Sequence, residues 1–434
     1  MTLVHKIFCY LNVNCNYAVL RNYSGLPDSL KSRDVDILIA RNDFDKNKKQ
    51  IVNIISKQSY KIITYFRSDR ILTFVCASID DLNIEIIQFD FIFQTSVYGL
   101  NIIDANQMLA TRVFNGKIYH VTNEYEFLDK YLYLKLLNQP YPEKYHSLKT
   151  EMEQSNSLKD ILKKITGCGS LLALEKLYSA TLKRRVLISN IKKRPLEQLS
   201  LFSLFFLHYL NNFISCKGYS IGFTGADGSG KTTLINEIKQ TLRKTYLAIE
   251  LFHFRPSLIP NLGDAAHKIK LKSDIDRNYS QPHRGTKVGK LNSFLRLLYY
   301  SFDYILGYIA RVRPFLHKRS IIIFDRYYTD IIADSRRSRI FLNHKFLYWL
   351  GKLFIPKLDY NILLTADRDV ILSRKQELNV KGIDQINGKM KFLSKKKGYY
   401  MVMNNGAPYE AVQKILTIVF EEQHRRNMKR IINK

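Results

Sequence analysis

Short apolar runs separated by polar stretches dominate the first 118 residues. The clearest are VDILIA at 35–40, RILTFVCAS at 70–78 and NIEIIQFDFIF at 83–93, all rich in Ile, Val and Phe. Such runs are typical of β-strands, and they alternate with short helical stretches. The pattern predicts a small α/β domain over residues 1–118.

Residues 119–216 change to a helical pattern. In YEFLDKYLYLKLL and LLALEKLYSATLKRRV, apolar residues recur three and four positions apart, with charges on the other face. The most apolar run, at 199–216, contains His208 and two asparagines. It falls short of the roughly 18 uninterrupted apolar residues that a membrane span needs. We therefore expect a helical connector with a buried helix at 199–216, and no transmembrane segment.

Strand and helix patterns alternate again over residues 217–434. This alternation predicts a third part, an α/β domain with a parallel sheet covered by helices. The stretch at 257–289 has no steady period, and a long functional loop, or a partly disordered one, is expected there.

A complete phosphate-binding motif stands near the start of this third part. Gly225 to Thr232 read GADGSGKT, between the apolar run YSIGFT and the amphipathic run TTLINEIKQTLRK. Glycines let backbone N–H groups wrap phosphate oxygens, and a helix N-terminus adds partial positive charge. We expect Lys231 to reach the β- and γ-phosphates of a nucleoside triphosphate, and Thr232 to bind Mg²⁺. The predicted nucleotide-binding residues are Gly225, Asp227, Gly228, Ser229, Gly230, Lys231, Thr232 and Thr233.

The run SIIIFDRYYTDIIADSRRSR, at 320–339, carries the second chemical signal. Its apolar strand ends in Asp325, and Arg326 follows at once. A carboxylate at that strand end can bind Mg²⁺ or accept a proton from an attacking group. Guanidinium groups match phosphate or carboxylate oxygens. Arg326 is therefore an acceptor-binding candidate, whereas Arg336 and Arg337 are equally compatible with a solvent-facing charge run.

A lysine-rich segment follows the apolar run YNILLTA. It contains Arg374, Lys375, Lys381, Lys389 and Lys391. A mobile basic flap can close over a phosphoryl group in transfer and neutralise its charge. A solvated helix face is the alternative for each lysine, and Arg374 is the candidate that we favour.

Together, GADGSGKTT, DRY at Asp325–Tyr327 and an arginine early in a lid resemble the thymidylate kinase family. FRP at Phe254–Pro256 stands where that family carries an arginine-glutamate-proline loop. The resemblance covers about residues 217–425 and implies a parallel five-stranded P-loop kinase domain that uses ATP and Mg²⁺. It also implies that Asp227 and Arg255 are acceptor-side residues, that Arg326 contacts the acceptor phosphate, and that Arg374 is the lid arginine.

The chain departs from that family at several positions. Thr224 replaces a usual glutamate, the loop glutamate is missing, and the segment after Pro256 is longer and more basic. The run DRYYTDIIADSRR looks more like divergent thymidylate-kinase-like proteins found with surface-polysaccharide genes. The acceptor is therefore either a nucleoside monophosphate or a sugar or glycan.

Two aspartates mark the front domain. Asp34 and Asp36 stand two apart at a strand start, so alternation places both carboxylates on one side. With Glu85 as third ligand, and Asp90 behind it, they can bind Mg²⁺ for phosphoryl or nucleotidyl transfer. The pattern resembles the nucleotidyltransferase superfamily over residues 1–118, although Ser32-Arg33 replaces its usual Gly-Ser turn. Two surface acids, or a degenerate binding domain, are the alternatives.

The overall charge widens the range of partners. Lys and Arg number 68 and Asp and Glu 38, giving a net charge of +30. This excess predicts an anionic partner or reflects compositional bias. Five scattered cysteines without a CxxC pair favour a reducing cytoplasm, and no signal peptide is expected.

Three classes of protein remain open on these grounds. The leading interpretation is a magnesium-dependent ATP phosphotransferase, an enzyme, with a homodimer left open. The alternative is a P-loop ATPase that binds nucleic acid as a switch or defence module, although the basic residues form no single stripe. A peripheral membrane protein would use the apolar run at 294–316, which we expect instead to be a core helix of the kinase domain.

Overall fold

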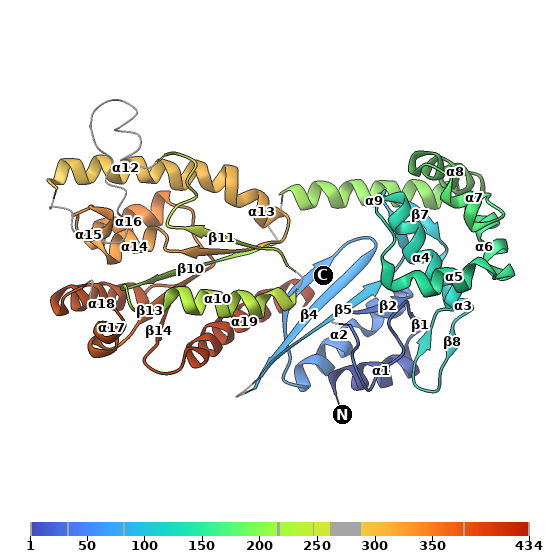
Figure 1. Cartoon of the computed structure of the whole chain (residues 1–434), viewed down its shortest axis with the longest axis horizontal. Coiled ribbons are helices and arrows are strands. Elements are labelled where there is room, and N and C mark those ends of the chain that lie inside the picture. Colours follow the sequence, from blue (N-terminus) through green and yellow to red (C-terminus); the bar gives the residue numbers. More distant parts are fainter. Residues whose placement is uncertain are drawn as a thin grey trace. The chain divides into compact units, whose positions relative to one another are not determined.

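The computed structural model describes residues 2–32, 34–80, 83–214, 218–245, 247–260, 288–375 and 378–432. Within it the chain forms two compact units (Figure 1). Unit 1 comprises Met1–Asn211 and Phe420–Lys434, and unit 2 comprises Asn212–Val419. The predicted domain boundary at 216/217 and most of the predicted loop, 261–287, lie outside the described residues.

Unit 1 is built on a mixed seven-stranded sheet in the order β3-β4-β5-β2-β1-β9-β8. The predicted strands at 35–40, 70–78 and 83–93 are confirmed as β2, β4 and β5. β2 and β5 run parallel, with Asp36 opposite Asp90. The strands are β1 (Tyr17–Val19), β2 (Asp34–Ile39), β3 (Lys61–Arg67), β4 (Ile71–Ile79), β5 (Ile84–Ile92), β8 (Val113–Phe114) and β9 (Tyr119–His120), with a separate pair β6 (Thr95–Val97) and β7 (Leu100–Ile103).

Two helices cover one face of this sheet. α1 (Leu3–Asn14) and α2 (Arg41–Lys57) share a core with Ile37, Phe74 and Phe91 of the strands. The end of α19 (Pro408–Ile432) joins them, because His424 Nδ1 accepts a hydrogen bond from the Ile62 amide (2.9 Å) and Asn427 donates to the Ile62 carbonyl (3.0 Å). The sequence places all of 217–434 in one domain, whereas these last residues pack in unit 1.

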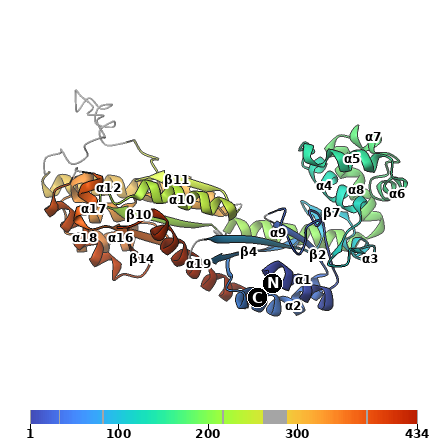
Figure 2. The ribbon, with the colours of Figure 1, turned by 60° about the horizontal axis from the view of Figure 1, so that its bottom comes forward.

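The predicted helical connector covers the other face of the same sheet. Figure 2 shows these helices gathered together, and their apolar side chains share a second core with Ala18, Leu38 and Ile92. The segment at 171–186 is two helices rather than one. The elements are α3 (Ala105–Ala110), α4 (Asn123–Leu136), η1 (Glu143–Tyr145), α5 (His146–Glu153), α6 (Asn156–Thr166), α7 (Leu171–Glu175), α8 (Ser179–Lys193) and α9 (Pro195–Ile214).

The expectation of a buried helix at 199–216 is wrong for residues 199–211, the part of this run whose burial the structure describes. On α9, Leu199, Phe206 and Leu207 are 64%, 59% and 61% exposed. Apolar residues surround α9 on several sides, so burying one side of the helix leaves the others in contact with solvent. None of the helices that the structure describes is long and apolar enough to cross a membrane.

Unit 2 contains a parallel five-stranded sheet in the order β11-β12-β10-β13-β14. This arrangement confirms the predicted parallel α/β sheet, and its strands are apolar because helices cover both faces. All five carboxyl ends meet at one edge, where ligands of such sheets usually bind. The strands are β10 (Tyr219–Gly225), β11 (Ile249–His253), β12 (Ile321–Asp325), β13 (Tyr360–Thr365) and β14 (Tyr399–Met403).

Helices pack on both faces of this second sheet. α10 buries Leu234, Ile238 and Leu242, and the helices after β11 share a core with Ile322, Phe324 and Leu363. The run at 294–316 is partly a core element, since Leu297 and Tyr304 are buried while Phe302 is exposed. The helices are α10 (Lys231–Leu242), η2 (Arg243–Thr245), α12 (Lys290–Gly307), the π-helix η3 (Tyr308–Val312), α13 (Arg313–His317), α14 (Tyr328–Ala333), α15 (Ser335–Ser338), α16 (His344–Phe354), α17 (Arg368–Arg374) and α18 (Val380–Ser394).

Candidate active site

The glycine loop, residues 225–232, connects the carboxyl end of β10 to the start of α10. Gly228 and Gly230 both have φ of +87°, a conformation that residues with a Cβ rarely adopt. A Cβ on Gly230 would also lie 2.4 Å from the Asn404 amide nitrogen. A residue with a Cβ at either position would therefore strain this backbone path.

Lys231 is folded back over this loop. Its side chain is buried, and Nζ donates hydrogen bonds to the carbonyls of Gly225 (2.7 Å) and Ala226 (2.9 Å). Burial, together with the nearby Arg326, lowers the pKa of Lys231 to about 7. An anion that reached the ammonium would stabilise its charged form.

Asp227, Arg326 and Arg337, all predicted acceptor-side residues, lie together in the structure. Arg326 Nη2 is 2.5 Å from Asp227 Oδ1, and Arg337 pairs with the other oxygen of Asp227. Arg326 Nη1 also donates to both oxygens of Asp330, at 3.0 Å each. Burial opposes the charge on Arg326, but the two carboxylates outweigh it and raise its pKa above the ordinary value. The sequence analysis missed Asp330, although it stands four residues after Arg326 on α14, a spacing at which helical side chains meet.

Asp325 ends β12, the strand beside β10. Its Oδ2 lies 3.3 Å from His253 Nδ1, while its Oδ1 is buried and makes no hydrogen bond with the described residues. Thr232 and Thr233 are exposed at the first turn of α10. A carboxylate oxygen and a hydroxyl are ligands that Mg²⁺ prefers, so Asp325 and Thr232 fit the predicted kinase metal.

Arg255 follows β11 at the same sheet edge, but its guanidinium forms a buried ion pair. Its Nη1 lies 2.9 Å from Asp303 Oδ2, and the two side chains are 3% and 0% exposed. The Asp303 carboxylate also accepts hydrogen bonds from the amides of Ser257 (3.2 Å) and Ile259 (2.8 Å). Asp303, which no local pattern marks, thus holds the arginine and the turn after it.

Arg374, the predicted lid arginine, lies at the glycine loop. Its Nη1 donates to the Asn404 carbonyl (2.9 Å), and the Asn404 amide donates to the Ser229 carbonyl (2.8 Å). Asn404 follows β14 and was missed, because only the strand order brings it to the loop. Ser229 Oγ and Asn404 Oδ1 are buried without a hydrogen bond among the described residues.

Lys375 of the predicted basic flap is the C-cap residue of α17, and the flap lysines at 381, 389 and 391 lie on α18. Four apolar side chains of α18, Ile383, Ile386, Met390 and Leu393, are in the unit 2 core. Lys389 Nζ donates to Ser335 Oγ (2.7 Å), and burial lowers the pKa of Lys389. Lys381, Lys391 and Arg336 are exposed.

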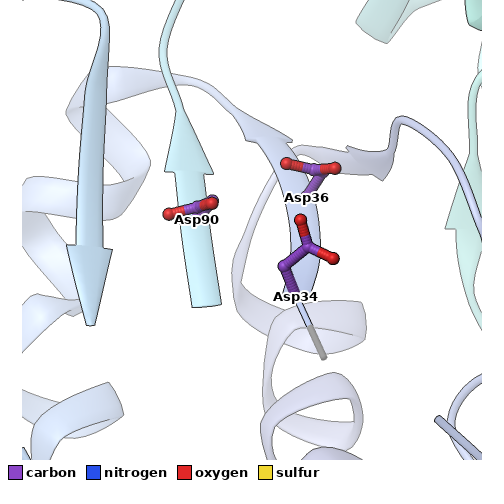
Figure 3. A group of neighbouring side chains, drawn as sticks. All are labelled: Asp34, Asp36 and Asp90. Carbon is purple, nitrogen blue, oxygen red and sulfur yellow. The ribbon is translucent and has the colours of Figure 1, made fainter. Parts of the chain in front are cut away.

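A second cluster lies in unit 1, where Asp34 and Asp36 of β2 stand beside Asp90 of β5 (Figure 3). One carboxylate oxygen from each residue lies within 4.8 Å of the others. Ser32 donates to Asp34, Thr73 donates to Asp90 (2.5 Å), and Gln88 donates to the other Asp90 oxygen (2.9 Å).

Glu85 does not join this cluster. It stands five residues before Asp90 on β5, and since side chains alternate along a strand, an odd separation places it on the opposite face. Its carboxylate accepts a hydrogen bond from the Tyr60 hydroxyl. The third acid beside the aspartate pair is Asp90, because the parallel register with β2 sets Asp36 opposite it.

The acid cluster already contains one cation. Arg21 Nε lies 2.6 Å from Asp36 Oδ2, and its Nη1 lies 3.4 Å from Asp129 on α4. Burial, with smaller effects from neighbouring carboxylates, raises the pKa of Asp90 to about 6, and burial also raises the pKa of Asp36. Three convergent carboxylates with one neighbouring arginine fit a divalent cation, since oxygen ligands suit Mg²⁺ and Mn²⁺.

Comparisons with known proteins do not assign this chain to a family. No protein-family model matches this chain, and no curated protein matches it. Among solved structures, the thymidylate kinase from Ehrlichia chaffeensis matches 46% of this chain and 98% of its own, at 15% identity and a TM-score of 0.34. The roles proposed below depend on the side chains of this chain and not on that similarity.

Proposed function

We propose that unit 2 is a magnesium-dependent ATP phosphotransferase. The observation that carries the proposal is the glycine loop with Lys231 buried in it and its ammonium hydrogen-bonded, among the described residues, to two loop carbonyls. A buried ammonium held by neutral groups gains most from an approaching phosphate. Asp325 lies at the neighbouring strand end, with one carboxylate oxygen that accepts no hydrogen bond from the part of the chain that the structure describes, and completes the arrangement.

Each side chain has a role in this proposal. Lys231 leaves the loop carbonyls and binds the β- and γ-phosphates, while Thr232 and Asp325 hold Mg²⁺, which neutralises phosphate charge when bound. Arg326 and Arg337 exchange Asp227 for acceptor oxygens, a replacement of one carboxylate by another anion. Arg374, next to the loop, neutralises the group in transfer.

The acceptor is a nucleoside monophosphate or a sugar or glycan. Phosphoryl transfer relies on positioning and electrostatics, which both acceptor classes can use. A screen with labelled ATP, comparing deoxynucleoside monophosphates with sugar phosphates and isolated surface glycans, would identify the class. If ATP with Mg²⁺ gives no binding heat in calorimetry, the proposal is refuted.

We propose metal-dependent nucleotidyl transfer as a second function, located in unit 1. The register that sets Asp90 beside Asp34 and Asp36 favours it. Asp34, Asp36 and Asp90 would hold the cation, which supplies charge neutralisation at a phosphate. The test is transfer of a labelled nucleotide by the full chain with Asp34→Ala and Asp36→Ala, and activity that survives both changes removes this function.

A further inference from the structure

A cavity of about 570 Å³ lies in unit 2, apart from the glycine loop. Part of its wall is formed by residues 355–358 and 395–398, which precede β13 and β14. These segments enter the sheet at the amino edge, opposite the edge where the glycine loop begins. Asn361 of its lining pairs with Gly222, three residues before Gly225 and so about 10 Å away along β10.

Tyrosine rings form much of this wall. Tyr327, Tyr328, Tyr348 and Tyr399 line the cavity, from α14, α16 and the start of β14. The hydroxyls of Tyr327 and Tyr328 donate to the backbone carbonyls of Pro356 (2.8 Å) and Leu347 (2.9 Å). Tyr327 and Tyr328 are only 3% and 4% exposed, so the ring surface open to a ligand comes from the partly buried Tyr348 and Tyr399. Such surface suits a planar base or the apolar face of a sugar.

The charged side chains that line the cavity are positive. Among the residues that the structure describes, five lysines line it, at 352, 357 and 395–397, and no aspartate or glutamate does. Lys396 Nζ lies 5.5 Å from the centre of the Tyr348 ring and 5.0 Å from that of Phe392, so this cation is held over aromatic surface. Positive charge gathered around a concave site favours an anion, and a phosphate most strongly because it carries more than one charge.

Neutral polar groups complete the lining. Thr329 Oγ1 lies 3.3 Å from Asn361 Oδ1, and the Asn361 amide donates to the Gly398 carbonyl (3.2 Å). A hydroxyl and an amide beside aromatic rings can bind ligand hydroxyls, and the volume suits a small molecule.

We propose that this cavity binds a small phosphorylated molecule carrying a sugar or base ring, either a nucleotide or a sugar phosphate. The lysines bind the phosphate and the tyrosines contact the ring. The lining contains neither the glycine loop nor Arg326, although Tyr327 to Thr329 directly follow that arginine in the chain, and the proposal does not depend on the kinase function.

Isothermal titration of the full chain tests this proposal with uridine 5′-monophosphate, glucose 1-phosphate and inorganic phosphate. We expect at least one ring-bearing probe to bind at least about tenfold more tightly than inorganic phosphate, because stacking alone adds that much. If uridine 5′-monophosphate binds more tightly, the ligand is a nucleotide, and if glucose 1-phosphate does, it is a sugar phosphate. Equal affinities would show that the cavity recognises the phosphate and the ring without distinguishing the two classes. Lys395→Glu with Lys397→Glu should weaken binding at least about tenfold by reversing two charges at the mouth.

Two controls separate this site from alternatives. Lys318→Glu with Lys345→Glu makes the same change in net charge at exposed lysines outside the lining, and should alter affinity less than about twofold. Lys231→Ala should also leave it unchanged, because the glycine loop is not part of the cavity. The proposal is overturned if neither ring-bearing probe binds at millimolar concentration, if the control pair weakens binding equally, or if Lys231→Ala abolishes it.

Discussion

The two candidate sites, the arginine cluster of unit 2 and the aspartate cluster of unit 1, organise their charges in opposite ways. In unit 2, the cations Arg326 and Arg337 are held by the carboxylate of Asp227. In unit 1, Asp34 and Asp90 instead accept hydrogen bonds from neutral side chains, and the one arginine pairs with Asp36.

This difference indicates which ligand each cluster suits. An arginine paired with a carboxylate can exchange it for a phosphate at little cost, because both are bidentate oxygen anions. Carboxylates held by neutral donors keep their mutual repulsion, which a divalent cation relieves. We therefore expect the unit 2 cluster to take an anion and the unit 1 cluster to take a cation.

The largest expected effect is on ATP turnover. Lys231→Ala should lower it about 10³-fold or more, since cations that stabilise transferring phosphates contribute on that scale. The matched control is Lys239→Ala, which removes a lysine from the same helix α10 away from the loop. Turnover of labelled ATP by Lys231→Ala at the wild-type rate, with the circular dichroism unchanged, would contradict the anion site.

The next effect is on stability in unit 2. Asp303→Asn removes the carboxylate that lies 2.9 Å from the buried Arg255 guanidinium, and should lower the free energy of unfolding by about 3–5 kcal/mol. Urea denaturation followed by the fluorescence of Trp349, the single tryptophan, measures it. The control is Asp384→Asn, whose pair with Arg368 is exposed, and which should cost less than about 1 kcal/mol. Equal losses of stability in the two variants would show that burial of the Arg255–Asp303 pair does not increase its contribution to folding.

A smaller effect distinguishes the third acid of unit 1. Asp90→Asn should weaken Mn²⁺ binding at least about tenfold, because even outer partners of metal ligands contribute 10–100-fold. Glu85→Gln, on the same strand but the opposite face, should leave it unchanged. Electron paramagnetic resonance titration of free Mn²⁺ measures both. If Glu85→Gln has the larger effect, the cation lies elsewhere.

The smallest effect concerns pH. Burial, with a contribution from Lys61, lowers the pKa of His424 below its usual 6.5. The unfolded chain then binds the proton more readily than the folded one. His424 therefore makes its full contribution to the stability of unit 1 above about pH 6.5, and this contribution is lost progressively as the pH falls below that value. In urea unfolding followed by circular dichroism, His424→Gln should reduce this loss of stability between about pH 6.5 and 5. An unchanged pH profile would exclude the role of His424.

Elements of the fold could be predicted wherever a continuous stretch of sequence carried the hydrophobic pattern. Three strands of unit 1 and the parallel sheet of unit 2 were predicted from apolar runs and alternation, because each run carries its own periodicity. The end of α19 falls inside the predicted third domain, whereas in the structure it packs in unit 1, since the periodicity of a helix does not specify which sheet the helix contacts. The exposed apolar face of α9 was unexpected for the same reason.

The candidate sites divide in a similar way. Gly225 to Thr232 and the Asp34–Asp36 pair were identified by spacing alone, since consecutive residues set their own geometry through their dihedrals. Asp303, Asn404 and Asp90 reach their partners only through strand order and register. For Asp90 and Glu85, a shift of one residue reverses the face that a side chain occupies.

The sequence by itself determined which short segments we propose as functional: a glycine loop with its lysine, an aspartate-arginine strand end and a pair of aspartates. The tertiary structure alone decided their partners. Asp227 and Asp330 hold Arg326, Asp303 holds Arg255, and Asp90 rather than Glu85 stands beside Asp36. The physical reason is that local backbone geometry depends on adjacent residues, whereas pairing depends on burial and register between segments far apart in the chain.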